Sequence, residues 1–157
     1  MSKKIDAEEI QRFLEKCGPD TKIYFGADSE VIKVNGKKFF DVTVVVVIHI
    51  DGCKGCKVFA ELSRHADQDQ VAGKPFTRMM KEAECVSELH ARLKDIFYDY
   101  EISIHLDINP KKTAGSSIAM EAARGYVKAL TMVEPELKPL AWAGSYCADR
   151  AKDLGLC

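Results

Sequence analysis

The sequence predicts a single α/β domain with a five-stranded mixed sheet and helices on both faces. Three β-rich runs follow one another in the first half of the chain, and β-rich and helical runs alternate in the second half. The 157 residues, 46% of them hydrophobic, suffice for one buried core and are too few for two ordinary domains. We therefore expect one domain over residues 1–157, in which residues 1–19 form a covering helix.

The first half of the chain is predicted to form a short helix and an antiparallel meander. Apolar residues among charges predict an amphipathic helix over Ile5–Cys17, which Gly18-Pro19-Asp20 ends. Asn35-Gly36 is typical of a tight hairpin turn. Four consecutive valines are typical of a strand buried on both faces. The predicted strands cover residues 22–29, 39–50 and 57–62.

The second half is predicted to alternate helices and strands. Residues 77–98 place apolar side chains at spacings of three and four without glycine or proline, which predicts the longest helix. The remaining expected elements are a strand over 101–108, a helix from Ser116 or Ser117 to about Met132, a strand over 138–143 and a final helix that opens at Gly144.

The overall charge excludes a protein that binds nucleic acid through bulk positive charge. The formal net charge is -1 and the isoelectric point is near 6.4. Any contact with nucleic acid must therefore come from a local basic patch. Lys111, Lys112 and Arg150 are the candidates, because they stand beside acidic residues that we single out below.

Nothing in the sequence predicts export or insertion into a membrane. The first residues lack the apolar stretch of a secretory signal, and no run approaches the roughly 18 to 20 apolar residues of a membrane span. Six cysteines spread through helix-like and strand-like segments do not resemble a disulfide framework. We expect a cytoplasmic protein with free thiols; the sequence carries no signal for its oligomeric state.

Two acidic residues stand near the carboxyl ends of predicted strands. Asp28 belongs to the first strand and Asp107 to the fourth, and such ends converge on one crevice of a mixed sheet. Two close carboxylates repel each other unless a cation lies between them, and a set of oxygen ligands favours Mg²⁺ or Mn²⁺. Two ions about 3.5–4 Å apart can activate water and stabilise the leaving oxygen of a phosphodiester.

Four short stretches resemble the signature of a known family. They are Phe25–Glu30, Arg78–Glu82, His105–Ile108, and Lys138-Pro139 followed by Ala148-Asp149-Arg150. In order and spacing they are similar to the YkuK family, a branch of the RNase H-like superfamily of predicted nucleases, from about Tyr24 to Lys152. The resemblance implies an RNase H-like fold and a metal-dependent nuclease that acts on RNA, RNA/DNA hybrid or structured DNA.

The resemblance also implies a site with four acids. Asp28 and Asp107 would bridge two Mg²⁺ or Mn²⁺ ions, Glu82 would add a ligand from a helix, and Asp149 would complete the site. Glu84 is the alternative helical ligand. We favour Glu82 because it flanks the buried stripe, whereas Glu84 shares its face with charged residues and is expected to point to solvent.

The chain departs from the family pattern in two places. Glu30 stands where the family has glutamine, and Asn109–Lys112 replaces glycine-rich sequence after Asp107. The changed loop affects the expected substrate more than the chemistry. Glu30 could be a further ligand, but we expect an exposed strand residue. His105 could shuttle a proton, but we expect a packed, hydrogen-bonded histidine.

The main alternative is a catalytically silent RNase H-like module that binds nucleic acid or another protein. It predicts weak affinity for Mg²⁺ and no metal-dependent turnover. The presence of all four acids favours the nuclease, because a silent site has no reason to keep like charges together.

Overall fold

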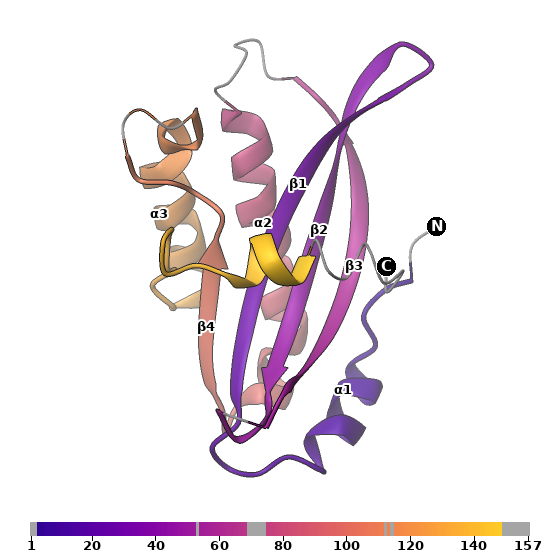
Figure 1. Cartoon of the computed structure of the whole chain (residues 1–157), viewed down its shortest axis with the longest axis vertical. Helices are drawn as coiled ribbons and strands as arrows, with labels where there is room; N and C mark the ends of the chain where they lie inside the picture. The colour runs from indigo at the N-terminus through magenta and orange to yellow at the C-terminus, as the bar shows by residue number, and fades with distance from the viewer. Residues whose placement is uncertain (1–2, 53, 69–74, 112, 114, 149–157) are drawn as a thin grey trace.

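A four-stranded mixed sheet in the order β3-β2-β1-β4 forms the centre of the computed structural model (Figure 1). The structure describes residues 3–52, 54–68, 75–111, 113 and 115–148. The elements are α1 (Ala7–Leu14), β1 (Lys22–Val34), β2 (Lys37–His49), η1 (Ile50–Gly52), β3 (Cys56–Ala66), α2 (Phe76–Leu93), η2 (Lys94–Phe97), β4 (Glu101–Leu106), η3 (Gly115–Ala119), α3 (Met120–Thr131) and η4 (Ala143–Ala148).

The predicted antiparallel meander is confirmed. β1 pairs with β2 and β2 with β3, both antiparallel. Asn35 and Gly36 have φ values of 51° and 76°, the positive values that a two-residue hairpin turn requires. β1 continues to Val34 and β3 to Ala66, beyond the predicted ends. Figure 1 shows the β1–β2 hairpin extending as an arm beyond the rest of the sheet.

Three helices share one face of the sheet. Ile10 of α1, Val86 of α2 and Val127 of α3 belong to one buried cluster with Phe25 of β1 and Ile104 of β4. The helix predicted over 77–98 is present as the α-helix α2 and, directly after it, the 3₁₀ helix η2. α2 also forms the crossover from β3 to β4, which lets β4 lie parallel to β1.

The opposite face is covered, in the described part of the chain, by η4. Figure 1 shows η4 (yellow) crossing in front of β1, with α2 behind the sheet. The two backbones touch because Gly26 and Gly144 have no side chains: a Cβ on Gly26 would lie 2.6 Å from the Gly144 nitrogen. We expected helices on both faces of the sheet. On this second face the described part of the chain has only η4, a short π-helix that begins at Ala143, one residue before the predicted start at Gly144.

The predicted fifth strand over 138–143 is wrong. In the described residues, the chain beside β4 makes a single isolated bridge, between Glu136 and His105. Pro139 has no N–H to donate to a strand ladder, and the next two N–H groups bond to the Leu137 carbonyl instead. The segment therefore turns away from the sheet edge.

The start predicted for the third helix is also wrong. α3 begins at Met120, and its N-cap is Ala119, which offers no side-chain acceptor. The residues before Met120 form the 3₁₀ helix η3, so the predicted caps Ser116 and Ser117 lie within that helix.

Candidate functional site

Asp28 and Asp107 stand next to each other where β1 and β4 leave their shared ladder. The last pair of that parallel ladder is Ala27 with Leu106, so the next residue along each chain is the acid. Side chains alternate along a strand, and therefore Asp28 points to the same face as Gly26, which contacts η4. Both carboxylates are partly buried. The two acids are therefore adjacent, as predicted, but only Asp107 follows the end of its strand; Asp28 lies within β1, which continues to Val34.

Helix α2 places Glu82 against Ser29, the residue that follows Asp28 on β1. The Glu82 side chain is only 2% exposed, and the Ser29 hydroxyl donates a hydrogen bond to its Oε1. Arg78, one turn earlier in α2, donates to the Ser29 carbonyl over 3.1 Å. Burial raises the pKa of Glu82 well above its ordinary value, and Asp28 and Asp107 raise it further, against the opposing effects of Ser29 and Arg78. The three carboxylates therefore interact electrostatically.

A lysine completes the described part of this site. Lys138 Nζ lies 2.6 Å from Asp107 Oδ1, and the Lys138 backbone N–H donates to the Ile108 carbonyl over 3.1 Å. The hydrogen bond to Asp107 raises the pKa of Lys138, and the charges of Asp107, Asp28 and Glu82 add to that effect, against partial burial. Sequence reasoning missed Lys138 as a site residue; its only signal was the Lys138-Pro139 pair in the family resemblance.

The donor atoms suit a hard divalent cation. All three acids offer carboxylate oxygens, and the cationic ammonium of Lys138 already lies against Asp107. The site therefore already holds one positive charge, the Lys138 ammonium, beside an oxygen to which we expect a metal ion to bind. Within the described ranges, no three His, Cys, Asp or Glu side chains lie together as a cluster that could hold a metal ion. A closed ligand shell would require these side chains to move, and the fourth expected acid, Asp149, lies outside the described residues.

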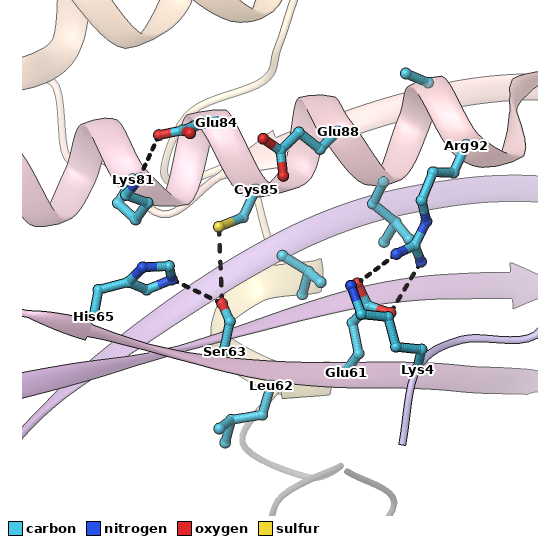
Figure 2. Close-up of a pocket in the computed structure, with 13 residues that line it drawn as sticks. Lys4, Glu61, Leu62, Ser63, His65, Lys81, Glu84, Cys85, Glu88 and Arg92 are labelled. Carbon is cyan, nitrogen blue, oxygen red and sulfur yellow. Dashed lines mark hydrogen bonds and ion pairs between the residues drawn. The ribbon is translucent and has the colours of Figure 1, made fainter. Parts of the chain in front are cut away.

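The alternative helical acid points elsewhere. Glu84 Oε2 lies 2.7 Å from Lys81 Nζ, and both residues line a pocket of about 470 Å³ between α2 and β3. Figure 2 shows this pair on the wall of that pocket, together with His65 and Cys85. Of the two glutamates, Glu82 is therefore the one that interacts with Asp28 and Asp107.

The predicted basic contacts are only partly described. Lys111 is exposed, and its backbone N–H donates to the Asn109 side chain over 3.0 Å. It follows Asp107 by four residues, so it belongs to the loop that leaves the acidic site. Lys112 and Arg150 lie outside the described residues.

His105 holds η4 against the sheet. Its ring is 1% exposed, and its Nδ1 accepts hydrogen bonds from the N–H groups of Trp142 and Ala143, both over 3.1 Å. Nε2 lies 3.4 Å from a Glu136 oxygen. Burial lowers the pKa of His105, against the opposing effect of Glu136. These contacts are those of the packed histidine that we expected.

One of the comparisons with known proteins identifies a family. A family model described as Ribonuclease H-like matches residues 7–152, a range that includes every residue of the candidate site. Comparisons with curated proteins and with solved structures gave no match. Among the described residues, no helix has the length and apolar character needed to span a membrane.

Proposed function

Because the chain belongs to the ribonuclease H-like family, we propose that it is a metal-dependent nuclease that hydrolyses phosphodiester bonds. The observation that carries this proposal is the convergence of three acids: the β1–β4 register sets Asp107 beside Asp28, and Ser29, next to Asp28, donates a hydrogen bond to Glu82 of α2. Carboxylates held together in a partly buried site repel one another, and a divalent cation relieves that repulsion.

In this proposal, Asp28, Glu82, Asp107 and Asp149 hold two Mg²⁺ or Mn²⁺ ions. Bound ions supply Lewis acidity toward water and toward the phosphodiester. The protein positions the ligands. The Ser29 hydroxyl holds Glu82 through a hydrogen bond, and the parallel register of β1 and β4 sets the two aspartates side by side. η4 lies on β1 at Gly26, and Asp149 follows η4 directly in the sequence.

The proposed substrates are RNA, RNA/DNA hybrid or structured DNA. With a net charge of -1, the protein must hold a phosphate backbone through a few basic side chains. Lys111 is exposed in the loop after Asp107, and Lys112 and Arg150 adjoin two of the acids in the sequence. We propose that these three side chains contact the backbone near the scissile bond.

A silent binding module is the second candidate function. One observation favours it: Lys138 already pairs with Asp107, so that part of the carboxylate charge is balanced without a metal ion. Such a module would bind nucleic acid or protein and would need no divalent cation.

Cleavage assays distinguish the two candidates. Labelled RNA, RNA/DNA hybrid and branched DNA are incubated with Mg²⁺, with Mn²⁺ or with EDTA, and wild type is compared with Asp28→Asn and Asp107→Asn. We expect metal-dependent cleavage that both variants lose while remaining folded by circular dichroism. Glu84→Gln is the matched control, because Glu84 lies on the same helix as Glu82 but pairs with Lys81. Binding without cleavage of any substrate would support the silent module instead.

A further inference from the structure

We propose that Lys138 is a built-in cation of the acidic site, which pairs with Asp107 until a divalent ion displaces it. The inference deepens the proposed function and rests on it, because it assumes that the acids receive a metal ion. It assigns Lys138 a role in setting metal affinity. Lys138 is a positioning residue in this proposal, and it need not touch the substrate.

The contact between Lys138 and Asp107 is close and well supported. Its two charged atoms are 2.6 Å apart, so that the ammonium and the carboxylate are in direct contact as an ion pair. The backbone hydrogen bond from Lys138 to Ile108 fixes the start of the lysine side chain beside the end of β4. The ammonium therefore meets Asp107 as a consequence of the backbone path.

The charges around Lys138 explain why it lies there. Asp107, Asp28 and Glu82 all act on Lys138 in the direction that favours its charged form. Glu82 is itself buried beside the two aspartates. A positive charge at this point reduces the repulsion among the three carboxylates before any metal ion binds.

A divalent ion and Lys138 compete for the same oxygen. Asp107 Oδ1 is buried and, in the described part of the chain, makes no well-aligned hydrogen bond; the Lys138 ammonium lies against it as an ion pair. An ion coordinated by this oxygen would meet the positive charge of Lys138 at close range, and the two like charges repel. The lysine side chain is 40% exposed, so the ammonium has a path to solvent once it leaves Asp107.

Metal affinity in a neutral variant tests the displacement. We would titrate Mn²⁺ by calorimetry into wild type and Lys138→Met after removal of metal with EDTA. We expect Lys138→Met to bind Mn²⁺ about ten-fold more tightly, because the ion no longer displaces a cation. Lys81→Met is the matched control, since Lys81 makes an ion pair with Glu84 at 2.7 Å on the other side of α2; its Mn²⁺ affinity should equal that of wild type. Equal or weaker binding by Lys138→Met would overturn the proposal.

A measurement on the unmutated protein covers the case in which Lys138→Met fails to fold. An amine-acetylating reagent is applied with and without saturating Mn²⁺, and the modified lysines are quantified by mass spectrometry. Displacement predicts several-fold faster acetylation of Lys138 with Mn²⁺ and no change at Lys81. An unchanged rate at Lys138 would contradict the proposal.

The outcomes separate this inference from the proposed function. Tighter Mn²⁺ binding by Lys138→Met without cleavage of any nucleic acid would support displacement and overturn the nuclease. Metal-dependent cleavage with equal Mn²⁺ affinity in both proteins would support the nuclease and overturn displacement. No Mn²⁺ binding by either protein would overturn both.

Discussion

At the scale of single residues, Glu82 makes the protein less stable than it could be. A carboxylate that is 2% exposed and close to two other carboxylates is costly to keep charged. Glu82→Gln removes the charge, and its amide oxygen can still accept the hydrogen bond from Ser29. We therefore predict that this variant is more stable in EDTA at pH 7 by on the order of 1–2 kcal/mol, measured by urea unfolding. A loss of stability would show that the charged form of Glu82 is needed for folding. Glu84→Gln is the control: it makes the same chemical change at a partly exposed glutamate of the same helix and should not raise stability.

A second residue-scale prediction concerns Cys85, on the wall of the pocket in Figure 2. Burial raises the pKa of its thiol to about 11, with smaller contributions from Glu88 and Glu84 against Ser63 and Lys81. About one thiol in a thousand is then ionised at pH 8, and the thiolate is the reactive form. We predict that iodoacetamide modifies exposed Cys56 well before Cys85, as mass spectrometry of digested protein can follow. Comparable rates would mean that the pocket opens readily to solvent.

At the scale of elements, the contact between η4 and β1 depends on glycine. Gly26→Ala would place a methyl group 2.6 Å from the Gly144 nitrogen, a backbone atom that cannot move aside without shifting η4. We predict a loss of about 1–3 kcal/mol of stability, together with reduced cleavage, since η4 leads into Asp149. Gly125→Ala is the control: in α3 its Cβ would meet nothing within 4 Å, so stability should rise by about 0.5–1 kcal/mol. Thermal unfolding of both variants provides the comparison.

The elements also show what the sequence could and could not predict. Hydrophobic spacing located α2, β2 and β4 because each is buried against the core. The ends of β1 and β3 were missed because neither is buried: residues 30–34 of β1 and 62–66 of β3 are exposed or only partly buried, so the alternation of buried and exposed positions ends before the strands do. The fifth strand failed for the opposite reason: residues 138–143 are apolar enough for a strand, but Pro139 removes a donor and the chain turns.

The candidate site was less predictable than the fold. Asp28 and Asp107 were selected because they stand near the ends of predicted strands, and Glu82 because the family resemblance calls for a helical acid and helical spacing favours Glu82 over Glu84. The role that we propose for Lys138 could not be predicted from the sequence. It depends on the backbone path that sets this residue beside Ile108, about thirty residues earlier in the chain.

At the scale of the whole molecule, histidines with lowered pKa values reduce stability as the pH falls below neutral. The pKa of His90 is lowered from its ordinary value of 6.5, first by burial and then by the charge of Lys94; burial also lowers those of His65 and His105. At these histidines the unfolded chain therefore binds more protons than the folded one, so their contribution to stability is complete above about pH 6.5 and is lost as the pH falls from there toward the lowered values.

The effect of His90 can be isolated from that of the acids. The raised pKa of Glu82 acts in the opposite direction, because its protonation at lower pH removes a buried charge from the folded state. His90→Gln leaves Glu82 and the other histidines in place while removing one titrating ring, which is 6% exposed and lies edge-on to Phe25. We predict that this variant loses less stability than wild type between pH 7.5 and pH 5.5, even if it is less stable at both, as urea midpoints at the two pH values would measure. An identical loss in the two proteins would mean that His90 gains its proton as easily in the folded chain as in the unfolded one, and that the packing around Phe25 opens to water.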